Sequence, residues 1–262
     1  MIKLENHEVV GWEHAIRGMR NPMNSWKKID SVFVPAMPRV DIYGETVEMV
    51  EAHYKDVYES VDKSDSYISI EKNSLEPREF WYEHIDIGPN DAKLMRSLAK
   101  AGSDHRKFMR MITVYVDIIA PLYWWKEFDT YKVGTVANSC STMHKIHAKE
   151  FELDDFSHEH LDMVFYDDKS WWDWESTLES IIDSLNYARE KFLETKDKRY
   201  WWQMIQLLPS SYNQKRTVML NYEVLTNMYH ARKNHKLDEW HDFCDWVRGL
   251  PYSELIVGEE EK

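Results

Sequence analysis

The segment from Met111 to Ala120 alternates with a period of two as far as Ile118, and it constrains the fold more than any other stretch of this 262-residue chain. Apolar β-branched side chains stand at every second position, namely Ile112, Val114, Val116 and Ile118. This alternation is typical of a strand with one buried and one exposed face. The segment therefore predicts a half-buried strand.

A helix is predicted on either side of this strand. Residues 89–102 (PNDAKLMRSLAKAG) offer Asn90 or Asp91 as the cap and Gly102 as the stop. Pro121 then occupies the first turn of a short helix, where its missing N–H costs little. The predicted order is helix, turn, strand, short helix.

Small polar residues follow around Gly134, between two hydrophobic regions. They are Thr130, Thr135, Asn138, Ser139, Cys140, Ser141 and Thr142. Backbone and hydroxyl groups at this density suit a loop that holds a ligand. An ordinary capped helix–loop connection is the structural alternative for the same residues.

Periodicity predicts further elements along the chain. Apolar residues at helical spacing indicate helices at 8–22, 45–62, 176–192, 217–234 and 237–247, and SYISIE at 66–71 indicates a strand. Ser176 and Glu179 fit a capping box. The acidic, Trp-rich residues 150–175 are interpreted as an insertion or a surface loop, and the tail GEEEK as a frayed end.

Composition narrows the class of protein. The net charge of −13 argues against a general nucleic-acid binder, because binding to phosphates requires a basic face. The chain lacks an apolar run of about 18 residues and a secretion signal, so we expect a cytoplasmic protein without a membrane partner. Cys140 and Cys244 fit a reduced setting better than a disulfide framework. The 12 Trp and 15 Tyr residues predict a large aromatic core and contacts between subunits.

Two candidate chemistries lack a complete motif. His144 with His147, and His158 with His160, can bring imidazoles together. No carboxylate or Cys completes a recognisable set, so we expect no metal site. Cys140 lacks a visible Asp–His pair, and no covalent catalysis is assigned to it.

The order helix, turn, strand, short helix and polar loop resembles that of the flavin-dependent thymidylate synthases. In that family the first helix ends in Gly-His-x-Ser/Thr. The strand then leads through a small-residue–Pro step to Arg-Gln-x-x-Arg-His-Arg-x-x-Ser-x-Asn-Glu-x-Ser-x-Arg-Tyr. Aligned without gaps from His105, Ala120-Pro121 falls on the Pro step. The later motif positions hold Lys126-Glu127, Thr130-Tyr131-Lys132, Thr135, Asn138, Cys140 and Thr142.

The C-terminal third carries the second half of the resemblance. LLPSSYNQKRTVMLNYEVLTNMYHARKNHKLDEW is similar to the family's Leu-Pro…Asn-x-Arg-x-x-x-Asn/His-x-x-x-x-Arg…His pattern. Four residues stand at the family's spacing, namely Pro209, Asn221, Asn227 and Arg232. Glu223 replaces an Arg, and His235 lies one residue earlier than the family's His. The resemblance covers residues 89–142 and 207–243.

The resemblance implies a fold and a reaction. The fold would be a single α/β (α+β) domain over residues 1–262, with a twisted, mainly antiparallel sheet and packed helices, assembled as a homotetramer. The activity would be methylation of dUMP to dTMP with FAD as cofactor, methylenetetrahydrofolate as one-carbon donor and NADPH as reductant. Alternatives are a homologue acting on a different pyrimidine nucleotide or nucleoside, and a non-catalytic oligomer that binds nucleotide or flavin.

The resemblance also assigns residues to a site. Arg232 would bind and polarise the pyrimidine ring as the catalytic residue. The cofactor would contact Lys107, Thr130, Tyr131, Lys132, Asn221 and Asn227, and the substrate would contact Glu127, Asn138, Cys140, Thr142 and Arg232. A helix over 217–234 would bring Arg232 back to the face of Asn221. A salt bridge to an acidic residue is the structural alternative for Arg232.

Several cations of the family's phosphate and flavin sites are missing from this sequence. Thr130, Thr142 and Ile205 stand where the family has arginines, and Lys132 replaces a fourth. Each lost charge-assisted hydrogen bond costs roughly 1.5–3 kcal/mol. We therefore expect weak binding of the dUMP phosphate unless another cation compensates, the candidates being Lys107, Lys126, Lys145 and Arg216.

Overall fold

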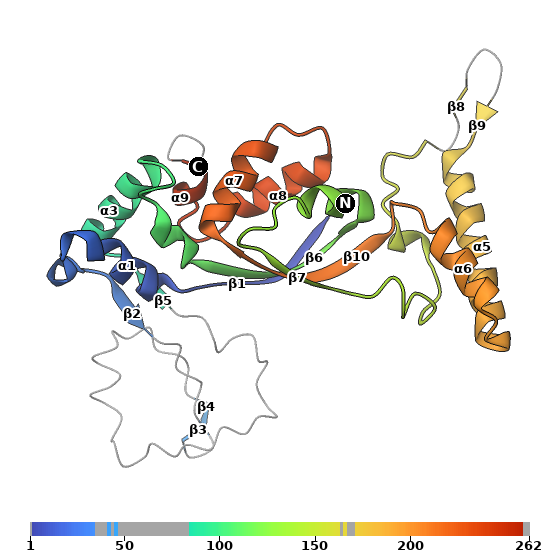
Figure 1. Ribbon diagram of the computed structural model, residues 1–262, viewed down its shortest axis with the longest axis horizontal. Helices are drawn as coiled ribbons and strands as arrows, with labels where there is room; N and C mark the ends of the chain where they lie inside the picture. The colour runs from blue at the N-terminus through green and yellow to red at the C-terminus, as the bar shows by residue number, and fades with distance from the viewer. Residues whose placement is uncertain are drawn as a thin grey trace. The chain divides into compact units, whose positions relative to one another are not determined.

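The computed structural model describes residues 2–34, 41–42, 45–46, 84–162, 165–166 and 171–258. The chain forms two compact units, one of residues 1–9 with 113–262 and one of residues 10–112. Figure 1 labels the elements of both units. The single domain over residues 1–262 stays a prediction. Within the described ranges, no helix is long and apolar enough to cross a bilayer.

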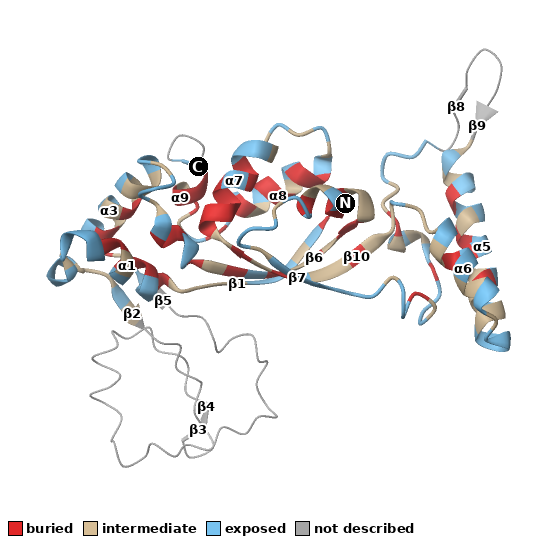
Figure 2. Ribbon diagram, viewed as in Figure 1, coloured by how far each residue is buried: buried red, intermediate tan, exposed pale blue. Residues whose placement is uncertain are grey.

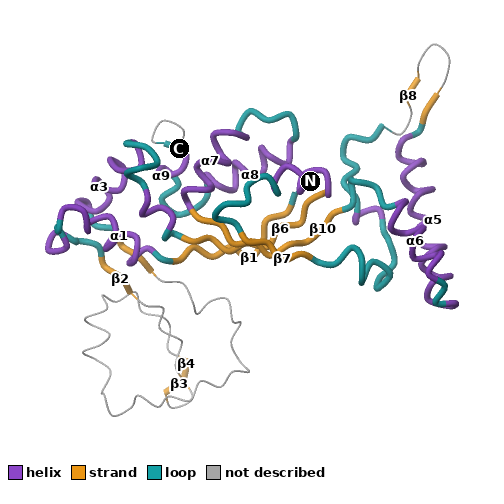
Figure 3. The backbone as a smooth tube through the Cα atoms, viewed as in Figure 1, coloured by secondary structure: helices purple, strands orange, loops and turns teal. Residues whose placement is uncertain are grey.

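A four-stranded sheet forms the centre of the larger unit, with the strand order β1-β6-β10-β7 (Figure 3). The strands are β1 (Lys3–Val10), β6 (Thr113–Pro121), β10 (Asn213–Asn221) and β7 (Val136–Ser139). β10 pairs antiparallel with both β6 and β7, so that Val218 lies opposite Val116 on one side and Ala137 on the other. The predicted antiparallel sheet and the predicted strand at 111–120 are confirmed.

Helices cover one face of this sheet. Every second residue of β6 is buried, including Val114, Val116 and Ile118, as the alternation predicts. α7 (Tyr222–Arg232) and α8 (Asp238–Arg248) lie on one side of the strands, and Figure 2 shows buried segments on both helices. The fold is therefore α+β, with apolar side chains of strands and helices forming the core.

Aromatic rings fill the space beside α8. They come from the short helix α4 (Leu122–Phe128), whose Trp124 and Trp125 are fully buried. The Trp124 ring lies 4.7 Å from Trp240 and 5.9 Å from Phe243 between centroids. The aromatic core expected from the composition is confirmed. The chain then closes the unit with α9 (Glu254–Val257).

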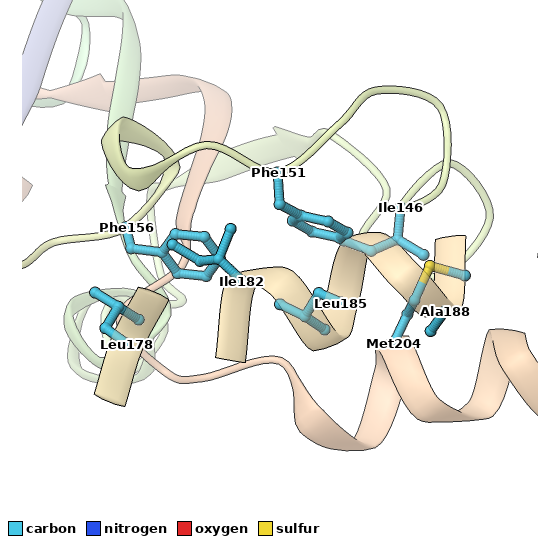
Figure 4. Packing of buried hydrophobic residues seen from close by; sticks show 8 residues of the cluster. All are labelled: Ile146, Phe151, Phe156, Leu178, Ile182, Leu185, Ala188 and Met204. Carbon is cyan, nitrogen blue, oxygen red and sulfur yellow. The ribbon is translucent and has the colours of Figure 1, made fainter. Parts of the chain in front are cut away.

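A second hydrophobic cluster holds the helices α5 (Trp174–Thr195) and α6 (Lys198–Leu207) together. Figure 4 shows side chains of the preceding segment lying against α5 and α6, and the cluster comprises Ile146, Phe151, Phe156, Leu178, Ile182, Leu185, Ala188 and Met204. The interpretation of 150–175 as a surface loop is wrong for Phe151 and Phe156, since both are buried. The remaining elements of this region are η6 (Leu153–Asp155), β8 (Phe165–Tyr166) and β9 (Trp171–Trp172).

The smaller unit consists of short helices and strand pairs. Its elements are α1 (Trp12–Arg20), η1 (Asn21–Met23), η2 (Trp26–Lys28), β2 (Val32–Val34), β3 (Asp41–Ile42), β4 (Glu45–Thr46), β5 (His84–Asp86), α3 (Pro89–Lys100) and η5 (Lys107–Arg110). The helices predicted at 8–22 and 89–102 are confirmed as α1 and α3. A buried ion pair joins them, with Arg20 Nε donating to Asp91 Oδ1 over 2.7 Å.

Two helix starts differ from the predicted ones because other side chains cap them. Pro89 fills the first position of α3, and the Asp30 carboxylate accepts the Asn90 and Asp91 amides at 2.9 and 3.0 Å. Neither Asn90 nor Asp91 is the cap. α5 begins at Trp174, where the Asp173 carboxylate accepts the Ser176 amide at 2.9 Å. The capping box at Ser176 and Glu179 is therefore wrong, because α5 starts before Ser176.

The helix predicted over 217–234 is wrong in its first part. Residues 213–221 pair with two neighbouring strands as β10, and the helix α7 starts only at Tyr222. The expected shared helix face of Asn221 and Arg232 therefore does not exist. Asn138 and Ser139 of the polar segment likewise lie in a strand, β7, rather than in a loop. The expected strand at 66–71, the tail and most of the helix at 45–62 lie outside the described residues, and Glu45–Thr46 form β4.

Asp117 stands on the open face of the sheet in a polar row. Its carboxylate accepts the Thr217 hydroxyl at 2.7 Å and the Asn6 amide at 2.9 Å, and the Lys215 ammonium lies 3.1 Å away. The Thr217 and Asn6 hydrogen bonds, followed by Lys215, lower the pKa of Asp117 to about 2. This carboxylate therefore stabilises the fold above its unfolded pKa near 3.9, and the stabilisation is lost as the pH falls towards 2.

We expect Asp117→Asn to lower the free energy of unfolding by about 1–2 kcal/mol at pH 7, because charge-assisted bonds become neutral ones. The difference between wild type and variant should shrink between about pH 4 and pH 2. Urea denaturation at several pH values measures both quantities. A difference that stays constant down to pH 2 would contradict the assignment.

Candidate functional site

Arg232 lies at the end of α7 and is anchored through two of its nitrogens. Its Nη1 donates to Glu127 Oε2 over 2.5 Å, and its Nε donates to the Tyr131 hydroxyl over 2.9 Å. Two aromatic rings flank the guanidinium, with its carbon 4.8 Å from the Trp240 centroid and 5.5 Å from that of Tyr131. Cation–π contacts of this kind add to the ion pair and restrict the guanidinium plane. The salt bridge considered as the alternative for Arg232 is present.

Glu127 is the acceptor for three donors at once. Besides Arg232, the same oxygen, Oε2, lies 3.1 Å from His235 Nε2 and 3.3 Å from Trp240 Nε1. These five side chains, Glu127, Tyr131, Arg232, His235 and Trp240, form what we call the Arg232 cluster. They come from α4, the turn after it, the end of α7, the turn that follows α7, and α8.

A buried carboxylate, that of Glu239, fixes α4 beside this cluster. The Tyr123 hydroxyl, in the first turn of α4, bonds to the buried Glu239 carboxylate at the start of α8. Burial and then the bond to Glu239 raise the pKa of Tyr123 to about 12, so its proton stays in place at neutral pH. α4 is thereby tied to α8 at both ends, which sets the orientation of Glu127.

Asn221 connects the polar segment to the start of α7. Its Oδ1 accepts the Val224 amide at 3.0 Å as the helix cap, and its Nδ2 lies 3.5 Å from the Gly134 carbonyl. Gly134 has a φ of +81°, and a Cβ there would come within 2.8 Å of the Val224 side chain. Only glycine fits this close approach without strain. The sequence feature around Gly134 thus marks a point where the chain packs tightly against α7.

The other predicted site residues of the larger unit lie on the polar segment after α4, on β7 and on α7. Thr130 donates its hydroxyl to the Glu127 carbonyl at 2.7 Å, which caps α4. Lys132 and Asn138 are exposed. Asn138 lies on β7, where it stands opposite Thr217 of β10. Cys140 is exposed, and its carbonyl accepts the Gln214 amide at 2.7 Å. Thr142 is half-buried after β7, and Asn227 is exposed on α7.

Arg216, one of the candidate compensating cations, is already engaged. Its guanidinium carbon lies 4.1 Å from the Trp125 ring centroid, and Nη1 donates to Asp129 Oδ1 over 2.7 Å. Its Nε donates to Gln214 Oε1 over 3.0 Å. This arginine is held in place by neighbours from α4 and β10, much as Arg232 is.

Lys107 belongs to the smaller unit, where it lines a cavity of about 810 Å³. Apolar side chains of α1, α3 and η5 contribute Met19, Leu94, Leu98 and Phe108 to its walls. Its polar lining includes the cations Arg20, Lys28 and Lys107 and the carboxylate of Asp104, with Asn90 and His105. An apolar cavity with a few cations suits a ligand with a ring system and negative charge.

Neither a metal cluster nor a disulfide is found among the described residues. No group of three His, Cys, Asp or Glu side chains in those ranges could hold a metal ion. Cys140 and Cys244 are both free, and burial raises the pKa of the Cys244 thiol to about 11. Cys244 is therefore a protonated core residue rather than a nucleophile.

Comparison with solved structures identifies the fold. No protein-family model matches the sequence, and no curated protein matches it either. The crystal structure of Thymidylate Synthase X (ThyX) from Helicobacter pylori with FAD and dUMP matches over 99% of this chain and 98% of that chain, with a TM-score of 0.56 at 14% identity. A second structure, of the flavin-dependent thymidylate synthase ThyX from Helicobacter pylori complexed with FAD and dUMP, matches with a TM-score of 0.55 at 13% identity.

The chain has the ThyX fold. The resemblance inferred from the two sequence segments is confirmed at the level of the fold, and it extends over nearly the whole chain. The roles of individual residues in a ThyX-like site stay predictions.

Sequence reasoning missed two members of the Arg232 cluster. Nothing in the sequence distinguishes Trp240 from the other Trp residues, and His235 stands out only because it lies one residue earlier than the family's His. The available signal for His235 is its position three residues after Arg232, a spacing that one turn brings together. In the structure, the His235 amide donates to the Arg232 carbonyl over 2.9 Å. Of the predicted substrate and cofactor residues, the structure brings together Glu127, Tyr131 and Arg232.

Proposed function

We propose that this chain is a ThyX-like enzyme that methylates a pyrimidine nucleotide, converting dUMP to dTMP. FAD is its cofactor, methylenetetrahydrofolate its one-carbon donor and NADPH its reductant, and the working form is a homotetramer. The observation that carries the proposal is the match over 99% of this chain to a protein whose structure holds FAD and dUMP.

Arg232 is the residue to which we assign the electrostatic role. Its Nε and Nη1 are engaged, whereas Nη2 makes no hydrogen bond to the part of the chain that the structure describes. The side chain is 18% exposed, so a ligand can reach it. Negative charge develops on a pyrimidine carbonyl when C5 becomes nucleophilic, and a pre-positioned guanidinium stabilises that charge. The ion pair with Glu127 supports this role, because it fixes the orientation of the cation.

The remaining assignments follow the ThyX pattern. Substrate contacts are proposed for Glu127, Asn138, Cys140 and Thr142. Cofactor contacts are proposed for Lys107, Thr130, Tyr131, Lys132, Asn221 and Asn227. The bound flavin would supply the hydride, and these residues would bind and orient it. Asn221 also caps α7, so its substitution by Ala would lower stability as well as cofactor binding.

The cavity of the smaller unit supports a flavin-sized ligand. Its volume of about 810 Å³ lies in the range of small-molecule sites. Lys28 and Lys107 contribute two ammonium groups to its lining, and they form no ion pair with the described residues. Two free cations at an apolar wall suit a ligand that carries both a ring and a diphosphate.

We expect Lys107→Ala to weaken FAD binding by at least about tenfold, because a charge-assisted hydrogen bond to phosphate is lost. Titration followed by flavin fluorescence measures the affinity. Lys27→Ala is the matched control, since Lys27 is exposed in the same unit and does not line the cavity. A wild-type protein that binds no FAD would reject the proposed function at its first step.

A second candidate function keeps the fold and cofactor but changes the substrate. Two of the positions that carry arginines in ThyX cannot hold a phosphate here. The Thr130 hydroxyl is bonded to the Glu127 carbonyl, and Ile205 packs against the cluster between α5 and α6. Arg216 is paired with Asp129. These observations favour a different pyrimidine or a nucleoside without the 5′-phosphate.

A further inference from the structure

We infer that His235 is a positioning residue, which holds the Glu127 carboxylate in place and through it fixes the Arg232 guanidinium. The inference rests on the proposed function, in which Arg232 acts on the pyrimidine. His235 itself is not assigned to the substrate or the cofactor. It acts only through Glu127.

The hydrogen bonds of the imidazole define its tautomer. The Leu237 amide donates to His235 Nδ1 over 3.2 Å, so Nδ1 must carry the lone pair. The proton of the neutral ring is then on Nε2, which lies 3.1 Å from Glu127 Oε2. The opposite tautomer would place two N–H donors against each other at Leu237. The backbone after α7 therefore selects the tautomer that donates to Glu127.

The donors to Glu127 are arranged so that the carboxylate cannot rotate freely. Arg232 Nη1, His235 Nε2 and Trp240 Nε1 all approach Oε2, at 2.5, 3.1 and 3.3 Å. Glu127 is 34% exposed, so without these donors its side chain could sample other rotamers in solvent. His235 approaches from the turn after α7 and Trp240 from α8. Without the His235 donor, nothing from the turn after α7 restrains the Glu127 carboxylate, and only the donors from Arg232 and Trp240 remain.

The backbone couples His235 to Arg232 directly. The His235 amide donates to the Arg232 carbonyl over 2.9 Å, which closes the turn at the end of α7. The turn places the imidazole 6.3 Å from the Trp240 ring, on the same aromatic surface that flanks the guanidinium. Arg232 and His235 thus stand at the two ends of one turn, and both contact the same oxygen of Glu127, Oε2.

Two substitutions separate the structural bond of His235 from its positioning bond. His235→Asn places an amide near Nδ1, so it can still accept the Leu237 amide but cannot reach Glu127. His235→Gln places an amide near Nε2, so it can still donate to Glu127. A residue with only a structural role should tolerate His235→Asn better than His235→Gln. A positioning residue should show the reverse order.

The first measurement needs no ligand. Phenylglyoxal modifies accessible arginines, and mass spectrometry of the peptide containing Arg232 gives its rate of modification. We expect His235→Asn to modify several-fold faster than wild type, with an unchanged melting temperature, and His235→Gln to modify at the wild-type rate. The second measurement is calorimetric binding of deoxyuridine to the FAD-loaded protein. We expect about a tenfold loss of affinity for His235→Asn and less than about threefold for His235→Gln.

The outcomes separate this inference from the proposed function. Equal Arg232 modification in wild type and His235→Asn overturns the positioning role, whatever binds. If His235→Asn lowers the melting temperature, the decision rests on His235→Gln, and fast modification of Arg232 in that folded variant overturns the inference. A wild type that binds FAD but no deoxyuridine or dUMP overturns the proposed function. In that case the rates of Arg232 modification still decide whether His235 positions the guanidinium.

Discussion

Replacing Arg232 by Ala is expected to abolish turnover of the pyrimidine while leaving FAD bound and the fold intact. A pre-positioned cation at a site of developing negative charge is worth about 2.7–4 kcal/mol, which corresponds to a loss of about 100- to 1,000-fold in rate. The structure supports the required pre-positioning, because Tyr131 and Glu127 hold two nitrogens of the guanidinium. Oxidation of reduced flavin on addition of the pyrimidine, followed by absorbance, measures turnover.

Two further variants control this experiment. Arg232→Lys should recover little activity, because an ammonium cannot replace the planar fork that bonds to Tyr131, Glu127 and a ligand together. Arg199→Ala removes an arginine whose side chain is exposed at the start of α6, and it should leave turnover unchanged. An active Arg232→Ala enzyme would remove this residue from the catalytic assignment. Parallel calorimetry with dUMP and deoxyuridine shows whether a phosphate contributes to binding.

The largest effect on stability is expected for Asp91→Ala in the smaller unit. Asp91 is fully buried, and one of its oxygens lies 2.7 Å from Arg20 Nε and 2.6 Å from Nη2. The other oxygen accepts the Asp30 amide, the Ser31 amide and the Ser31 hydroxyl at 3.0, 3.0 and 2.7 Å. Removing one partner of a buried pair typically costs about 3–5 kcal/mol, because the remaining charge is left without compensation. Chemical denaturation followed by circular dichroism measures the loss.

An exposed ion pair of the same unit provides the control. Arg17 and Glu13 lie 4.0 Å apart on α1, with side chains 59% and 55% exposed. Glu13→Ala should therefore change the stability by no more than about 0.5 kcal/mol. Comparable losses of stability in Asp91→Ala and Glu13→Ala would show that the buried network around Asp91 contributes no more to the free energy of unfolding than an exposed ion pair.

Local periodicity predicted those elements whose sequence signal agrees with their packing. β6 alternates because one face is buried, and α3 and α8 carry apolar residues at helical spacing. β10 was missed because its sequence QKRTVML runs directly into α7, and the apolar spacing continues across the boundary. Pairing with strands on both sides decides its conformation, and no local pattern encodes those partners. The cap of α3 was missed for the same reason, since Asp30 is 60 residues away from Asn90.

The candidate site was predictable in its residue types more than in its contacts. The resemblance to the family's pattern identifies Arg232 together with Asn221 and Asn227, and a salt bridge is the alternative for Arg232. The sequence offers 46 acidic residues as partners, and nothing local distinguishes Glu127, which is 105 positions away. The tautomer of His235 depends on the Leu237 amide. Such choices are made by tertiary structure alone.

Two carboxylates at the end of the short helix α4, Glu127 in its last turn and Asp129 directly after it, each hold an arginine from elsewhere in the chain. Glu127 holds Arg232 at the end of α7, and Asp129 holds Arg216 in the middle of β10. In an evolving lineage, neither arginine can be exchanged freely, because its loss leaves a carboxylate of α4 without its cation. We therefore expect each arginine and its carboxylate to be inherited as a pair.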